Sequence, residues 1–164
     1  MNYLVAMLLL LSPIHPQTKP STPEGWRSVE ACRLTFLIPV SASLTNDLGI
    51  DSCVREFRAK DVLIALDVTV GYTSNDLRNF RNENAGKSQF HLSETIVGGR
   101  KALVVTFYDA EVPEEAAGLN YVSGLFVPEM GKRPGSLWMW VYSRNPEGQI
   151  GARKIFESIR FGKR

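Results

Sequence analysis

Cysteine and histidine are the side chains of this sequence best suited to nucleophilic chemistry. Cys53 follows Asp51 and Ser52, so an acid, a hydroxyl and a thiol are adjacent. A thiolate nucleophile needs a base, which is usually a histidine. His15 lies in a proline-rich stretch, which leaves His91 as the usable base, and the sequence has no C-x-x-C redox pair. Cys53 therefore has three interpretations: half of a disulfide, an inert buried thiol or a nucleophile.

Of these interpretations, we expect a disulfide between Cys32 and Cys53. Each cysteine lies in a segment rich in strand-forming residues, Val29–Ile38 and Ser52–Arg58, with turn residues between the segments. If these two strands pair antiparallel, the cysteines can face each other within bridging distance. An even cysteine count in an exported chain also favours a disulfide. The bridge would close a loop of about 20 residues and contribute roughly 3 kcal/mol in the chain-entropy model.

An acidic loop is the candidate for metal binding. Asp109, Glu111, Glu114 and Glu115 lie close together, and their hard oxygen ligands suit calcium. The loop lacks the glycine turn and the ligand spacing of an EF-hand, so we interpret these residues as solvated loop charges. Zinc requires three or four His, Cys or acidic ligands, which His91 and two bridged cysteines do not supply. We expect no metal and no cofactor.

Two tryptophans could bind a sugar or a peptide by stacking. Trp138 and Trp140 are two residues apart in Leu137–Tyr142, a predicted strand that is apolar on both faces. Tryptophans with this spacing more often pack under a helix, so we expect them in the core. A strand that is apolar on both faces is covered on both faces, which favours a layered domain.

Composition and charge are those of an ordinary globular domain. The chain has 164 residues, 44% of them apolar and 22% charged, with a formal net charge of +2. Its basic residues are scattered, whereas proteins that bind nucleic acid usually carry a strongly basic face. We therefore expect no nucleic-acid partner.

The N-terminal region differs from the rest of the sequence. Residues 1–11 contain the unbroken apolar run Tyr3–Leu11, which has the length of the hydrophobic region of a secretory signal and is too short to span a bilayer. Residues 12–25 form a proline-rich spacer that we expect to be disordered. A buried N-terminal helix is the alternative. We expect a signal-peptide-like segment, a secreted or periplasmic location, and no membrane span after the signal is removed.

Residues 26–161 are predicted to form a single α+β domain, followed by the tail 162–164. A short helix is expected within Gly71–Lys87. A second helix begins at Asn145 and Pro146 and carries the apolar stripe Ala152, Ile155, Phe156 and Ile159. Gly98–Gly99 indicates a two-residue hairpin. The further predicted strands are Asp61–Val70, Gln89–Val97, Lys101–Tyr108, Tyr121–Val127 and Leu137–Tyr142. We expect a mainly antiparallel sheet of about six or seven strands flanked by helices.

Several short signatures support this fold class by resemblance. They are LTFLIP (Leu34–Pro39), GIDSCVREF leading into VLIALDVTVGYTSNDL (residues 49–77), IVGGRKALVV (Ile96–Val105) and ARKIFESIRF (Ala152–Phe161). The pattern resembles small exported bacterial domains of the PsbP-like fold, which is named after an extrinsic subunit of plant photosystem two and shared by a small Ran-binding nuclear-import protein. The resemblance implies an α/β/α sandwich. Members of this fold have unrelated functions, and many resemble accessory or binding proteins without known catalysis.

The sequence therefore predicts a non-catalytic, exported accessory or binding domain of the cell envelope, with an unidentified protein or small-molecule partner. The alternative is a small enzyme or a metal-dependent binding protein that uses His91 and the acidic loop. A third possibility is a cytosolic interaction module of the Ran-binding kind, which requires free thiols and a retained apolar N-terminus.

Overall fold

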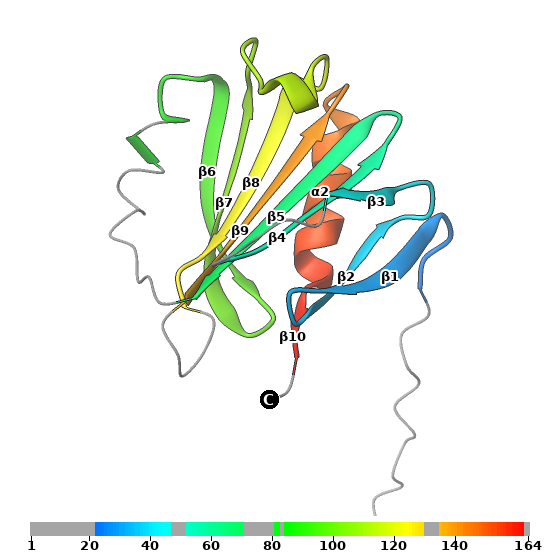
Figure 1. The fold of residues 1–164 in the computed structure, drawn as a ribbon. Helices are drawn as coiled ribbons and strands as arrows, with labels where there is room; N and C mark the ends of the chain where they lie inside the picture. The colour runs from blue at the N-terminus through cyan, green and yellow to red at the C-terminus, as the bar shows by residue number, and fades with distance from the viewer. Residues whose placement is uncertain (1–21, 47–51, 71–80, 83, 130–134, 163–164) are drawn as a thin grey trace, which may run out of the picture.

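The computed structural model describes residues 22–46, 52–70, 81–82, 84–129 and 135–162, and most of them lie in β-strands (Figure 1). Seven strands form a large antiparallel sheet in the order β3-β4-β5-β9-β8-β7-β6. Every pair of neighbouring strands in this sheet is consecutive in the chain except β5 and β9. The strands are β3 (Ser43–Asn46), β4 (Ser52–Ala59), β5 (Val62–Val70), β6 (Ser88–Val97), β7 (Arg100–Tyr108), β8 (Tyr121–Val127) and β9 (Gly135–Ser143).

A small sheet of three strands, in the order β1-β2-β10, lies beside the large one. Its strands are β1 (Trp26–Ala31), β2 (Leu34–Pro39) and β10 (Arg160–Phe161). The chain turns between β1 and β2 at Cys32 and Arg33, whose φ angles of 53° and 62° lie in the left-handed region. The predicted single strand Val29–Ile38 is therefore wrong, because a two-residue hairpin turn divides it.

One helix, α2 (Glu147–Ser158), packs against one face of the large sheet, next to the β1–β2 hairpin (Figure 1). It is the only α-helix for which the structure describes both ends, and a short 3-10 helix, η1 (Glu114–Ala116), lies in the loop before β8. The helix expected within Gly71–Lys87 falls mostly outside the described residues. No helix among the described residues is long and apolar enough to cross a membrane.

The expected α/β/α sandwich is wrong, because the described chain is mostly antiparallel strand in two sheets, with one helix. The inference from β9 assumed that helices must cover both of its apolar faces. Within the described residues, α2 covers one face. On the other face, the loop residue Val112 and the η1 residue Ala116 pack with Leu63 and Tyr142 of the sheet.

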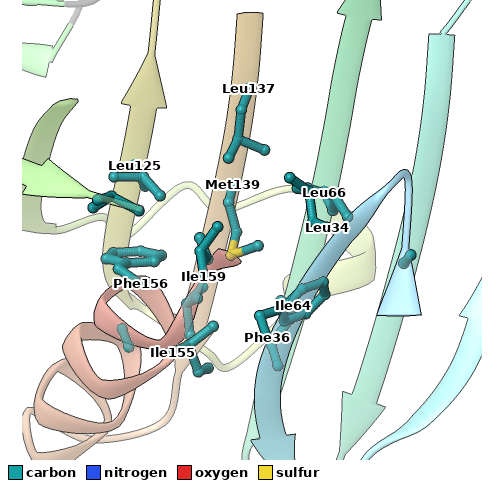
Figure 2. Close-up of a cluster of buried hydrophobic side chains, with 14 of the residues drawn as sticks. Leu34, Phe36, Ile64, Leu66, Leu125, Leu137, Met139, Ile155, Phe156 and Ile159 are labelled. Atoms are coloured by element: carbon teal, nitrogen blue, oxygen red, sulfur yellow. The ribbon is translucent and has the colours of Figure 1, made fainter. Parts of the chain in front are cut away.

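The main core lies where α2 and the small sheet meet the large sheet (Figure 2). The predicted stripe on the helix is confirmed, since Ala152, Ile155, Phe156 and Ile159 are all buried. Ala152, Ile155 and Phe156 share one side of α2, whereas Ile159 directly follows the helix and has extended backbone angles. All four pack against alternate residues of the sheets, which include Leu34, Phe36, Ile64, Leu66, Leu125, Leu137 and Met139.

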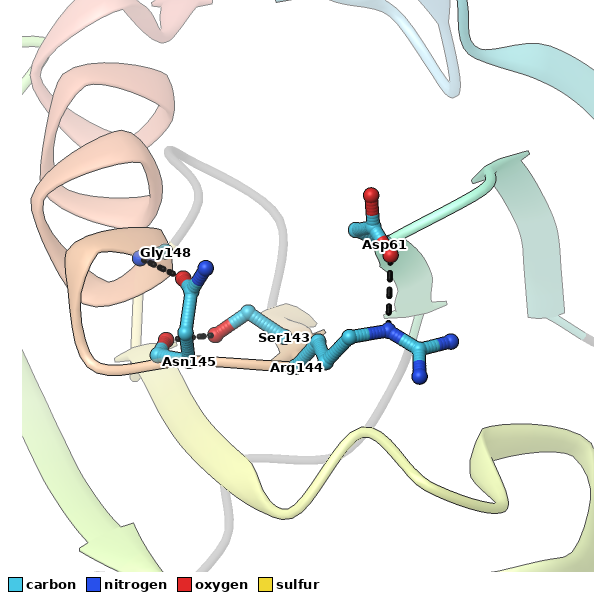
Figure 3. A network of polar contacts seen from close by, with 5 residues as sticks. All are labelled: Asp61, Ser143, Arg144, Asn145 and Gly148. Atoms are coloured by element: carbon cyan, nitrogen blue, oxygen red, sulfur yellow. Dashed lines mark hydrogen bonds and ion pairs between the residues drawn. The ribbon is translucent and has the colours of Figure 1, made fainter.

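Asn145 caps the N-terminus of α2, as its position before Pro146 predicts (Figure 3). The Gly148 N–H donates a hydrogen bond to Asn145 Oδ1 at 3.2 Å, and Pro146 already has helical backbone angles. The Ser143 hydroxyl lies within hydrogen-bonding distance of the carbonyl oxygens of Tyr121 and Asn145. These bonds hold the first turn of α2 against the end of β9.

The predicted disulfide between Cys32 and Cys53 is present, with a Cα–Cα distance of 5.6 Å. Its structural setting differs from the prediction. The neighbours of β4, which carries Cys53, are β3 and β5, and Cys32 lies on the turn of the β1–β2 hairpin. The disulfide therefore links the small sheet to the large one and does not cross-link two paired strands.

Candidate functional site

A cavity of about 380 Å³ lies between α2 and the part of the large sheet formed by β6, β7 and β8. This volume is within the range of small-molecule sites, about 300–1,000 Å³. The main core fills the space under α2 over β9 and β5 with apolar side chains, whereas the cavity walls carry hydroxyl, amide, imidazole and charged groups. The cavity is therefore the polar continuation of the same helix–sheet interface.

A β-bulge determines which side chains of β6 face this cavity. Ser88 pairs with Tyr108 and His91 pairs with Thr106, so β6 has one extra residue between these two pairs. Gln89 lies in this segment and has a φ of 58°. Because side chains alternate along a strand, one inserted residue reverses the face to which the following residues point. As a result, His91 points to the α2 side of the sheet. Leu92 points to the other face, where it packs against an apolar cluster that includes Val105, Phe107 and Val122.

Three polar side chains form a row across the sheet at the cavity wall. The register places His91 opposite Thr106, and Thr106 opposite Ser123. Residues that are opposite each other in antiparallel strands project to the same face, with Cβ atoms about 4.5–5.5 Å apart. One imidazole and two hydroxyls thus lie side by side, and Ser93 and Thr95 line the cavity further along β6.

Ser123 is the most unusual member of this row. The residue is 1% exposed, and its hydroxyl has no hydrogen-bond partner among the described residues. Leaving a buried hydroxyl without a partner costs about 1–3 kcal/mol, and most buried polar groups in folded proteins are paired. An unpartnered polar group in the wall of a cavity is the arrangement expected where a ligand or ordered water supplies the missing bond.

The helix contributes Gln149, Arg153 and Glu157 to the opposite wall. These residues are four positions apart, so they lie on one side of α2. Gln149 is near the row of Ser123, since its Nε2 lies 3.5 Å from the carbonyl oxygen of Val122.

The charges at the cavity are few and largely compensated. Arg153 Nε lies 2.8 Å from Glu157 Oε1, and both side chains are exposed. Glu94, on β6, is also exposed. The inner wall, formed by residues such as Thr106, Ser123 and Val104, carries no formal charge. The deep part of the cavity is therefore neutral and offers hydrogen bonds.

The structure does not bring His91 and the acidic loop into one site. Asp109 forms an ion pair with Lys87 at 2.8 Å and accepts a hydrogen bond from the Glu111 N–H at 3.0 Å. Burial by itself would raise the pKa of Asp109, but these bonds outweigh burial and lower it. The loop lies near Tyr142, whose pKa is raised by burial and then by the charges of Asp109 and Glu115, among others.

Tyr142 belongs to the apolar clusters on the face away from α2, so the loop and the cavity are separate. Within the described part of the chain, no group of three or more His, Cys, Asp or Glu side chains could hold a metal ion. Cys53 is in the disulfide and is not available as a nucleophile. The tryptophans Trp138 and Trp140 also lie on the face away from α2, where both are half-buried.

The sequence interpretation found His91 but missed the hydroxyls around it. One signal was readable: in Gln89–Val97, the polar residues His91, Ser93 and Thr95 alternate with larger or charged ones. Thr106 and Ser123 come from other strands, and only the register reveals that they extend this row.

No protein-family model and no curated protein matches this chain. The resemblance to PsbP-like domains stays a prediction. The site must therefore be interpreted from its own chemistry.

Proposed function

We propose that this protein is an exported, non-catalytic binding domain whose small-molecule site is the cavity between α2 and β6, β7 and β8. The observation that carries the proposal is Ser123, a residue of the cavity lining whose buried hydroxyl has no hydrogen-bond partner among the described residues. A ligand that bonds to this hydroxyl would recover the free energy that the unliganded protein loses by burying it.

Export is supported by the disulfide between Cys32 and Cys53. Disulfides persist in oxidising compartments and are rare where thiols are kept reduced. The bridge also argues against the cytosolic interaction module, which requires free thiols. The apolar run Tyr3–Leu11 has the character of a secretory signal.

A binding role is favoured over catalysis by the surroundings of His91. A catalytic histidine that activates a hydroxyl is usually oriented by a third group and bonded to its nucleophile. Within the described residues, His91 has no hydrogen bond to Thr106, the hydroxyl opposite it, and no carboxylate orients its ring. The His91 imidazole is exposed at the cavity mouth, where it can act as one more hydrogen-bonding group.

The proposal can be tested by filling the cavity. Ser93 lines the cavity, so Ser93→Trp should occupy it, whereas Lys101→Trp places the same ring on an exposed position outside the lining. Both oxidised variants and the unmodified protein would be screened by saturation-transfer NMR against mixtures of neutral sugars, amino acids, nucleosides and dicarboxylic acids.

We expect at least one compound class to bind the unmodified protein and Lys101→Trp but not Ser93→Trp. If Ser93→Trp binds the same compounds with unchanged signal, the cavity is not the binding site. If no class binds the unmodified protein, the small-molecule function is wrong.

A further inference from the structure

We infer that the ligand of this cavity is an uncharged, polyhydroxylated molecule of the size of a sugar. The inference rests on the proposed function and concerns only the chemical class of the ligand. It comes from the kind of hydrogen-bonding groups in the wall, their neutrality and the position of the apolar side chains beside them.

The wall offers hydroxyls that can both donate and accept hydrogen bonds. Ser93 and Thr95 of β6, Thr106 of β7 and Ser123 of β8 contribute one hydroxyl each. A serine or threonine hydroxyl has one donor and two acceptor positions. A ligand that carries several hydroxyl groups can also donate and accept, so it can form hydrogen bonds with the wall hydroxyls whichever of the two groups is the donor. An apolar ligand would leave the Ser123 hydroxyl buried without a partner.

An anionic ligand fits the wall less well. The one guanidinium of the lining, Arg153, is held by Glu157 at 2.8 Å. The nearby Lys154 does not line the cavity, because its Nζ lies 4.6 Å from the centre of the Trp26 ring on the other side of α2. Sites for carboxylates or phosphates usually present a free Arg or Lys fork close to the ligand, whereas Arg153 lies at the exposed rim and is paired with Glu157.

A cationic ligand is disfavoured because the carboxylates lie at the exposed rim of the cavity and not in its buried part. Glu157 is already engaged by Arg153, and Glu94 and Glu157 are both exposed. The buried part of the wall, around Ser123 and Thr106, contains no carboxylate. A cation would therefore lose its hydration in the deep part of the cavity without gaining an opposite charge.

Three apolar side chains complete the match to a sugar. Val97, Val104 and Phe156 line the cavity together with the hydroxyls, and Phe156 is presented by α2. Sugar rings combine hydroxyl groups at their edge with C–H groups on their faces, so they need both kinds of surface. The cavity of about 380 Å³ holds the liquid volume of about a dozen waters, which is enough for such a ring.

The test compares sugars that differ in charge but share one ring. Amide NMR spectra of the oxidised protein would be recorded with D-glucose, D-galactose and N-acetyl-D-glucosamine, which are neutral, with D-glucuronate, which is anionic, and with D-glucosamine, which is cationic. Concentrations up to about 50 mM would reveal affinities weaker than millimolar. We expect at least one neutral sugar to shift the amide signals of Ser93, Thr106, Ser123 and Gln149 in a saturable way, and the charged sugars to shift them much less.

Two variants test whether the hydroxyls of the cavity wall contribute to sugar binding. Ser123→Ala and Thr106→Val each remove one hydroxyl with little change in shape, and each should weaken binding of the neutral sugar about five- to tenfold. Ser136→Ala is the matched control, since Ser136 is an equally buried strand serine outside the cavity. Unchanged affinity in both Ser123→Ala and Thr106→Val would overturn the inference.

The remaining outcomes separate the ligand class from the binding function. If D-glucuronate or D-glucosamine shifts the cavity signals and no neutral sugar does, the ligand class is wrong while the cavity remains a binding site. If no sugar shifts them, the ligand class is again wrong. In that case the screen with Ser93→Trp decides independently whether the cavity binds any small molecule.

Discussion

Gly124 of β8 lies opposite Trp140 of β9, and the indole ring occupies the space where a side chain at position 124 would begin. A Cβ atom built on Gly124 would lie 2.4 Å from Cζ3 of Trp140 and 2.9 Å from Cγ1 of Val105. Carbon atoms in van der Waals contact are about 3.5–4.0 Å apart. The absence of a side chain at position 124 therefore allows the indole ring to pack directly against the backbone of β8.

Substitution of this glycine should destabilise the protein. Gly124→Ala must displace the indole or the strand, and overpacking of this kind typically costs about 1–3 kcal/mol. Gly151→Ala is the control, because a Cβ there would meet only Cη2 of Trp26, at an ordinary 3.8 Å. Gly151 lies in α2, so alanine should stabilise the protein by about 0.5–1 kcal/mol. Urea denaturation measures both, and equal effects of the two substitutions would contradict the prediction.

Ser123→Ala should stabilise the unliganded protein while it weakens ligand binding. The substitution removes a buried hydroxyl that has no partner, so we expect the free energy of unfolding to rise by about 1 kcal/mol. Few residues outside a functional site combine these two effects. Thermal and urea denaturation would be compared with those of Ser136→Ala. A loss of stability in Ser123→Ala would mean that the hydroxyl is bonded in the folded protein.

Loss of the disulfide should weaken the attachment of the small sheet to the large one. Cys32 and Cys53 are 21 residues apart, and the chain-entropy model gives about 3 kcal/mol for a loop of this length. We expect the double variant Cys32→Ala/Cys53→Ala to unfold at correspondingly lower urea concentration. Reducing agent should have the same effect on the unmodified protein and none on the double variant. Unchanged stability after complete reduction would show that the noncovalent contacts of the hairpin suffice.

Stability should depend on acid pH through Asp109. Its pKa is lower in the folded protein, so its ionised form stabilises the fold above the unfolded pKa of about 3.9, and this contribution is lost as the pH falls through the folded pKa. Lys87→Met should lower the free energy of unfolding by up to about 1 kcal/mol near neutral pH. The loss should become smaller at about pH 2, below the unfolded pKa, as the carboxylate of Asp109 becomes protonated.

Urea denaturation at the two pH values tests this dependence. Lys101→Met removes an exposed lysine on β7 and serves as the control for the loss of one positive charge. If Lys87→Met lowered the free energy of unfolding equally at both pH values, the ion pair with Asp109 would not be the reason why Lys87 stabilises the protein.

The two hairpin turns show how far the sequence determines the strands. Gly98 and Gly99 have φ angles of 54° and 79°, and the glycine pair predicted this turn correctly. Cys32 and Arg33 adopt a similar left-handed backbone without glycine or asparagine, so nothing in their side chains indicated a turn. Tertiary contacts, including the disulfide and the hydrogen bond from the Gly162 N–H to the Arg33 carbonyl, support this conformation.

The strong periodic elements were predictable and the arrangement of layers was not. The stripe of α2 and the alternation in β5 and β9 depend on local spacing, which the sequence contains. The arrangement of layers depends on which segment packs on each face of the sheet, and contacts between distant segments decide this. The sequence shows that Trp138, Trp140 and Tyr142 are apolar or aromatic, but not whether a helix, a loop or other rings lie over them.

The candidate site was predictable only in part, for a related reason. His91 drew attention because histidine is rare in this chain, and the structure places it at the cavity mouth. Serine and threonine on strands are common and carry no signal by themselves. The bulge at Gln89 sets the face of β6, and such a one-residue insertion has no clear mark in the sequence.

The position of β9 has a consequence for how the chain folds during its synthesis. Every other pair in the large sheet joins consecutive strands, but β5 ends at Val70 and its partner β9 begins at Gly135. While a growing chain still lacks residues 135–143, the apolar strand β5 has an open edge that can pair with other chains. We expect chains that are interrupted before β9 has been synthesised to aggregate through this edge.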